Sequence, residues 1–160
     1  MNGRTGRVAE IDRKRRRGCL IAIGGGEDKD PEGERLILKE IARHVRGGTL
    51  VLATVASREP DAYYEDYCKA FADLDVGELV HLYVGERSEA GDRDKLRALD
   101  DAAGIFFTGG DQLRITSQIG DSGIEAKVRA LHERGGVIAG TSARASGVRG
   151  VMVVGGFGGV

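Results

Sequence analysis

Short apolar runs alternate along the chain with longer segments in which apolar residues recur at helical spacing. Runs of this length, closed by glycine or polar residues, are typical of strands in a parallel sheet that is covered on both faces. The runs predict strands at residues 19–23, 50–53, 79–82, 105–107 and 137–139. The segments between them predict helices at about residues 33–46, 61–72, 92–101, 112–119 and 124–134. An aromatic stripe in the second helix, with Tyr64, Tyr67 and Phe71 on one face, predicts a core contact.

Strict alternation of strand and helix predicts parallel pairing with right-handed crossovers. The expected fold class is therefore α/β, a three-layer, doubly wound, mostly parallel sheet of the flavodoxin-like type. No linker or internal repeat interrupts the pattern, so residues 18–160 are expected to belong to a single domain. In sheets of this kind, ligands bind outside the carboxyl ends of the strands.

Composition narrows the classes of partner. Lys and Arg (24) nearly cancel Asp and Glu (25), so no net field favours nucleic acid or an anionic membrane. No apolar stretch is long enough to span a membrane, and the first residues lack the apolar core of a signal peptide. Cys19 and Cys68 form no metal-binding pair, which favours a reduced, cytoplasmic protein without a metal site.

Residues 1–17 form a separate basic segment that includes the run Arg13 to Arg17. Such a run is compatible with binding to a polyanion, or with a flexible, solvated leader ahead of the first strand. No aromatic residues are interleaved with the charges to stack on bases, so we expect a leader.

Glycine-rich turns follow three of the predicted strands, at residues 24–29, 108–112 and 140–146. The first turn lacks both the dinucleotide-binding fingerprint and a P-loop, so a nucleotide site is not predicted. It presents Glu27, Asp28 and Lys29, either as a solvated turn or as part of a substrate site. Because all three turns lie at the carboxyl ends of strands, we expect them to converge on one crevice.

The second turn, Thr108 to Gln112, contains adjacent glycines. Backbone N–H groups of such a turn can point into a site without obstruction, as an oxyanion hole requires. Gln112 is a candidate substrate contact. Asp111 also suits the N-cap of a helix over residues 112–119.

The third turn places Ser142 directly after a buried strand, as in the strand–turn–helix elbow that carries a nucleophile. A serine nucleophile needs a base, usually a histidine, within hydrogen-bond reach. His44, His81 and His132 all lie within predicted helices or strands, where packing explains them better than catalysis does.

Taken together, three motifs in this order resemble the cyanophycinase family of peptidase E-like serine peptidases. They are Gly-Gly-Gly-Glu-Asp-Lys (24–29), Phe-Phe-Thr-Gly-Gly-Asp-Gln-Leu-Arg-Ile (106–115) and Gly-Gly-Val-Ile-Ala-Gly-Thr-Ser-Ala (135–143). The resemblance implies a fold like that of class I glutamine amidotransferases. It also implies an exopeptidase that releases β-Asp-Arg dipeptides from cyanophycin (multi-L-arginyl-poly-L-aspartate), needs no cofactor and is compatible with a homodimer.

Carried over to this sequence, the resemblance makes Ser142 the nucleophile, which attacks the scissile carbonyl to form an acyl-enzyme. The backbone N–H groups of Gly110, Asp111 and Ala143 form the oxyanion hole, and Gln112 contacts substrate. The resemblance also implies that the first turn shapes the substrate site through Glu27, Asp28 and Lys29.

Two departures from the family pattern bear on activity. The elbow has Arg144 where the family has glycine, and the family's Asp-Gln-His-Phe segment, which supplies the base, has no counterpart. We therefore expect the N-terminal part of a cyanophycinase-like domain, with impaired activity. The alternatives are an inactive truncated homologue, an α-aspartyl dipeptidase and, more remotely, an amidotransferase-like domain, which would have cysteine at position 142.

Overall fold

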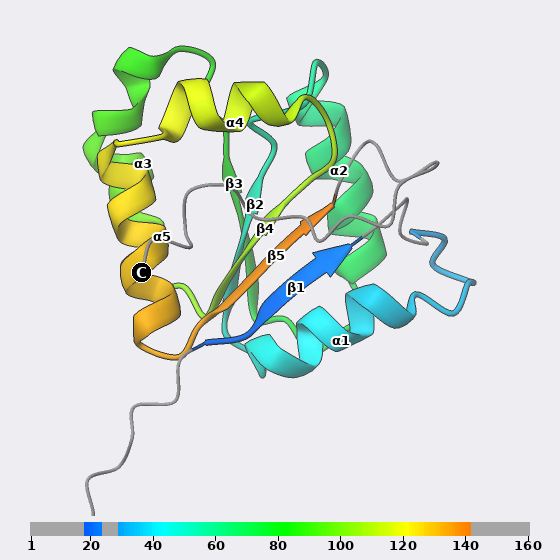
Figure 1. Cartoon of the computed structure of the whole chain (residues 1–160). Coiled ribbons are helices and arrows are strands. Elements are labelled where there is room, and N and C mark those ends of the chain that lie inside the picture. The colour runs from blue at the N-terminus through cyan, green and yellow to red at the C-terminus, as the bar shows by residue number, and fades with distance from the viewer. Residues whose placement is uncertain (1–17, 24–28, 142–160) are drawn as a thin grey trace, which may run out of the picture.

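The computed structural model describes residues 18–23 and 29–141. Its centre is a five-stranded sheet in the order β1-β5-β4-β2-β3, in which every paired strand is parallel (Figure 1). The strands are β1 (Leu20–Ile23), β2 (Thr49–Ala53), β3 (Glu78–Leu82), β4 (Gly104–Phe107) and β5 (Val137–Thr141). The predicted parallel α/β fold is confirmed.

Helices cover both faces of the sheet, so the domain has three layers (Figure 1). One face packs against α1 (Leu36–Val45) and α2 (Pro60–Phe71). The other face packs against the 3₁₀ helix η1 (Arg87–Gly91) and the α-helices α3 (Arg93–Arg97), α4 (Gln112–Ile119) and α5 (Gly123–Glu133). The predicted helix at 92–101 is thus shorter than expected, and a 3₁₀ turn that was not predicted precedes it.

The predicted aromatic stripe of α2 lies in the core as expected. Tyr67 and Phe71 are buried, and the ring of Tyr67 meets that of Phe106 edge-on, with centroids 5.1 Å apart. Tyr64 is half-buried and donates a hydrogen bond through its hydroxyl to Leu79 O at 3.0 Å. The helix is therefore fixed to the central strand β4 and to the edge strand β3.

The expectation that the first strand is buried on both faces is wrong for β1. Within the described residues β1 is an edge strand that pairs with β5 alone, and Leu20 is 57% exposed. An apolar run identifies a strand but does not say where in the sheet the strand lies, because that depends on long-range pairing.

An ion pair joins the start of α1 to the end of α2. Arg35, which is 4% exposed, donates through Nη1 and Nη2 to Asp73 Oδ1 (2.6 Å) and Oδ2 (2.8 Å). Its Nη1 also donates to Ala70 O at 2.8 Å. This bidentate contact holds the pKa of Asp73 down to about 2.

The Arg35–Asp73 pair predicts a pH-dependent contribution to folding. Because the pKa of Asp73 falls from its usual 3.8 to about 2, the folded state holds fewer protons than the unfolded chain across that range. The contribution is complete above about pH 3.8 and disappears as the pH falls towards about 2. We expect Asp73→Asn to reduce stability at pH 5–7 and to flatten the loss in acid, measured by urea unfolding over a pH series.

Asp66→Asn is the matched control for this experiment. It removes an exposed carboxylate from α2, the helix that Asp73 follows, and no ion pair of Asp66 is found among the described residues. It should leave the wild-type acid profile unchanged. If the stability of Asp73→Asn changed with pH in parallel with that of the wild type, the ion pair would not contribute to the pH dependence of folding.

Candidate active site

Two neighbouring strands of the sheet are followed by helices on opposite faces. This arrangement creates a crevice at the carboxyl ends of the two strands. β2 and β4 are paired with Ala53 opposite Phe107. The chain leaves β2 for α2 on one face and leaves β4 for α4 on the other. Such a switch point is where open α/β sheets bind their ligands.

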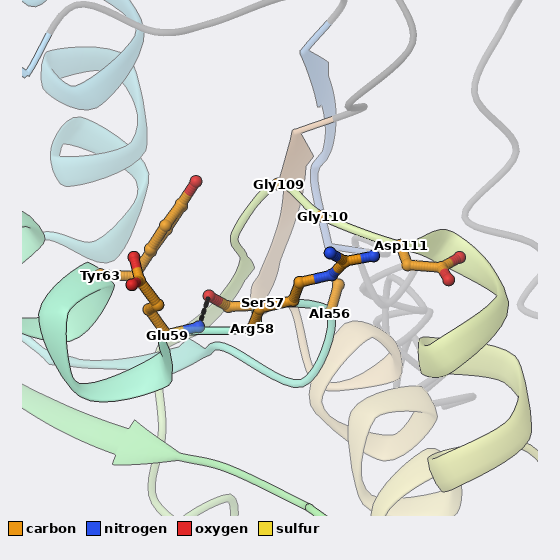
Figure 2. Close-up of a pocket in the computed structure, with 8 residues that line it drawn as sticks. All are labelled: Ala56, Ser57, Arg58, Glu59, Tyr63, Gly109, Gly110 and Asp111. Carbon is orange, nitrogen blue, oxygen red and sulfur yellow. Dashed lines mark hydrogen bonds between the residues drawn. The ribbon is translucent and has the colours of Figure 1, made fainter.

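A pocket of about 450 Å³ occupies this switch point (Figure 2). One wall comes from the predicted turn after β4. The other comes from the loop after β2 and the first turn of α2, which sequence analysis did not predict as part of a site. The lining residues are Ala56, Ser57, Arg58, Glu59, Tyr63, Gly109, Gly110 and Asp111.

Hydrogen bonds join the two walls into one frame. The Asp111 N–H donates to Ala56 O at 3.1 Å, and Arg114 Nη1 donates to Ser57 O at 3.2 Å. Within the loop after β2, the Ser57 N–H donates to Thr54 O and the Glu59 N–H donates to Ser57 Oγ, each at 3.0 Å. The main chain around the pocket is therefore held from both sides.

Gly110 allows the two walls to approach this closely. Its φ of 153° is one that residues with a side chain rarely adopt, and a methyl group on its Cα would lie 2.2 Å from Ala56 O. Among the described residues no acceptor is recorded for the N–H of Gly109 or Gly110. Gly110 is thus the better placed of the predicted oxyanion donors in this turn.

The bond from Asp111 to Ala56 counts against the predicted oxyanion role of the Asp111 N–H, because that hydrogen is already engaged. The side chain of Asp111 instead caps α4, accepting from the Leu113 N–H at 3.0 Å. This is the other role that the sequence suggested for Asp111. Gln112 is the first residue of α4, and its predicted contact with substrate stays a prediction.

The strands that lead into the three predicted turns end side by side. Ile23 at the end of β1 pairs with Thr141 at the end of β5, and Phe107 pairs with Gly140. A methyl group on Gly109 would lie 3.7 Å from Thr141 Cγ2, so β5 ends next to the Gly109–Gly110 turn. Four predicted site residues, Ser142, Ala143, Glu27 and Asp28, lie outside the described residues.

Lys29 is near the pocket but is not among its lining residues. Its Nζ lies 5.1 Å from the ring centroid of Tyr63 and 4.9 Å from that of Tyr67. Tyr63 lines the pocket, whereas Tyr67 belongs to the core. Lys29 therefore supports the pocket wall through cation–π contacts, and its predicted contact with substrate stays a prediction.

None of the three histidines lines this pocket, and each has a structural partner. His44 Nε2 lies 3.0 Å from Glu40 Oε1, and His132 Nε2 lies 2.9 Å from Gly18 O. His81 Nε2 lies 2.7 Å from Thr54 Oγ1, and its ring stacks on Tyr64.

His81 and Thr54 pair an imidazole with a hydroxyl, as a catalytic base and its nucleophile would. The burial of Thr54 excludes that role. Thr54 is 0% exposed, so substrate cannot reach its hydroxyl. Burial lowers the pKa of His81, and the nearby Asp61 partly opposes this effect. The contact therefore anchors the start of the loop that lines the pocket.

Comparison with known proteins shows the family of this chain. Residues 20–151 match the model of peptidase family S51. The chain belongs to this family. It is 35% identical to a cyanophycinase of Synechococcus elongatus over 143 residues, which cover 88% of this chain and 44% of that protein. It is 32% identical to a cyanophycinase of Geminocystis herdmanii (strain PCC 6308) over 147 residues, or 89% of this chain and 53% of that protein.

The chain thus spans about half the length of the curated S51 relatives that it matches. Solved structures support the fold. A peptidase from an acI-B1 Actinobacterium has a TM-score of 0.64 at 22% identity, covering 78% of this chain and 54% of its own. A candidate peptidase E of Listeria monocytogenes EGD-e has a TM-score of 0.53 at 20% identity, covering 79% and 59%.

Among residues 18–23 and 29–141, no group of His, Cys, Asp and Glu side chains is arranged to hold a metal ion. No helix in these same segments has the length and apolar character needed to cross a bilayer.

The close approach at Gly110 predicts a strong effect of a single methyl group. In Gly110→Ala the new Cβ would meet Ala56 O at 2.2 Å, and the backbone would also be strained by its φ of 153°. We expect a loss of about 1–3 kcal/mol in the free energy of unfolding, measured by urea titration.

Gly91→Ala is the control, because nothing lies within 4 Å of a methyl group at that glycine. It should change stability by less than about 0.5 kcal/mol. Equal effects of the two substitutions would show that the contact between Gly110 and Ala56 is not a constraint on the fold.

Proposed function

We propose that this chain carries the nucleophile and oxyanion side of a serine exopeptidase that hydrolyses cyanophycin to β-Asp-Arg dipeptides. The observation that carries the proposal is the position of Thr141. The last residue of β5 lies next to the Gly109–Gly110 turn, which lines the switch-point pocket, and Ser142 follows it in sequence. Membership of family S51 and the cyanophycinase relatives support this choice of chemistry.

In the proposed mechanism the substrate's carbonyl carbon lies at the end of β5 and its oxygen faces the Gly110 turn. Ser142 Oγ attacks the carbonyl, and its proton passes to a base. The N–H groups of Gly110 and Ala143 stabilise the oxyanion, a role in which one donor is worth about 3 kcal/mol of barrier. The amine leaves with a proton, and water then hydrolyses the acyl-enzyme. No step needs a metal or an organic cofactor.

Turnover by this chain is expected to be slow, because a serine nucleophile depends on its base. His44, His81 and His132 are all engaged elsewhere in the fold. An α-aspartyl dipeptidase remains the competing specificity, and a homodimer is compatible with the family resemblance.

Replacing the proposed nucleophile tests the function directly. We expect Ser142→Ala to abolish release of β-Asp-Arg from cyanophycin and to prevent labelling by a fluorophosphonate probe. Both readouts require the hydroxyl at position 142. The assay is dipeptide release followed by chromatography, with an α-aspartyl dipeptide as a parallel substrate.

Ser88→Ala, an exposed serine on η1, is the matched control and should keep wild-type release and labelling. Release that continues unchanged in Ser142→Ala would rule out the proposed nucleophile. Faster cleavage of the α-aspartyl dipeptide than of cyanophycin would favour the competing specificity. An unlabelled wild-type chain without turnover would identify an inactive homologue.

A further inference from the structure

We propose that Arg58 determines specificity in this pocket by binding a free carboxylate of the aspartyl-arginine unit. The inference rests on the proposed function and adds to it the side chain that recognises the substrate. Neither the sequence pattern nor the family motifs singled out Arg58. Its position follows from the pairing of β2 with β4, which places the loop after β2 opposite the Gly109–Gly110 turn.

The first observation is that Arg58 combines exposure with a concave setting. It is exposed and lines the pocket, and among the described residues its guanidinium is found in no ion pair or hydrogen bond. Two arginines of neighbouring elements are engaged, by contrast: Arg35 binds Asp73, and Arg114 binds Ser57 O. Arg58 thus presents free N–H donors where a ligand would lie.

The second observation is that the backbone carrying Arg58 is held in place. The residues on either side, Ser57 and Glu59, are joined by the bond from the Glu59 N–H to Ser57 Oγ at 3.0 Å. Arg114 fixes the Ser57 carbonyl from α4 at 3.2 Å. A side chain that starts from a fixed backbone loses less freedom on binding, which favours recognition.

The third observation is the direction of the side chain. In Figure 2 Arg58 extends past Ala56 towards the side of the pocket formed by Gly110 and Asp111. A carboxylate bound there would lie next to the proposed oxyanion donor, so its recognition would also position the scissile carbonyl. The planar guanidinium can bind a carboxylate through two parallel N–H···O bonds.

The charges in the pocket match the chemistry of the proposed substrate. Glu59 and Tyr63 lie on the other side of the pocket from the Arg58 guanidinium (Figure 2). The pocket therefore offers a cation on one side and the Glu59 carboxylate on the other, while the Asp111 carboxylate on the Arg58 side accepts from the Leu113 N–H as the cap of α4. An aspartyl-arginine unit carries a free carboxylate and a guanidinium, and so presents the complementary pair.

Calorimetric titration of the Ser142→Ala chain tests the assignment without turnover. The ligands are β-Asp-Arg and the same dipeptide with both carboxylates converted to amides. We expect the diamide to bind about tenfold more weakly, the factor associated with losing one charge-assisted contact. Adding Arg58→Gln should weaken the binding of β-Asp-Arg by about the same factor and abolish the difference in affinity between the two ligands. Arg58→Lys should restore part of that difference.

Arg46→Gln is the matched charge control. Arg46 is exposed and lies between α1 and the start of β2. It is therefore at the amino-terminal ends of the strands, whereas the pocket is at their carboxyl ends. It should leave both affinities unchanged, and circular dichroism should show all variants folded.

Two results would overturn the proposal: persistence of the difference between dipeptide and diamide in Arg58→Gln, or no binding of β-Asp-Arg to the Ser142→Ala chain. These experiments test the role of Arg58 separately from the proposed function. If hydrolysis survives in Ser142→Ala while carboxylate binding depends on Arg58, the nucleophile is wrong and the binding residue stands. If hydrolysis is lost in Ser142→Ala while Arg58→Gln still binds the dipeptide more tightly than the diamide, the nucleophile stands and the assignment of Arg58 is wrong.

Discussion

The site depends on the absence of a side chain at Gly110. Because no Cβ intervenes, the turn after β4 packs directly on the Ala56 carbonyl of the loop after β2, and the Asp111 N–H can donate to that carbonyl. These loops belong to strands whose helices diverge to opposite faces of the sheet, so their contact forms the base of an open crevice. The pocket that the two loops line depends on this approach.

Most of the individual elements were predictable because the local pattern and the glycine stops agree with the structure. β2, β4 and β5 begin or end within a few residues of their apolar runs. The order of the strands was not predictable, because no local feature of residues 104–107 says that they lie between β2 and β5. The same limit explains the unexpected exposure of Leu20, and η1 is too short to show a helical period.

The site was predictable in part. Adjacent glycines after a buried strand identified the turn at residues 108–112, of which Gly109, Gly110 and Asp111 line the pocket. The facing loop contains no glycine, and Arg58 is one charged residue among many in the sequence, so only the pairing of β2 with β4 reveals it. For Asp111 the sequence allowed two roles, and the hydrogen bonds of its N–H and of its carboxylate favour the cap.

The frame of the pocket is built largely from main-chain groups, and this has a consequence for how such enzymes diversify. The carbonyls of Ala56 and Ser57 and the N–H groups of Asp111 and Glu59 make the bonds that shape the loop. The side chains at positions 58 and 59 take no recorded part in those bonds. Substitutions there can change the preferred ligand while leaving the architecture intact, so new selectivity can evolve on this scaffold without a compensating change in folding.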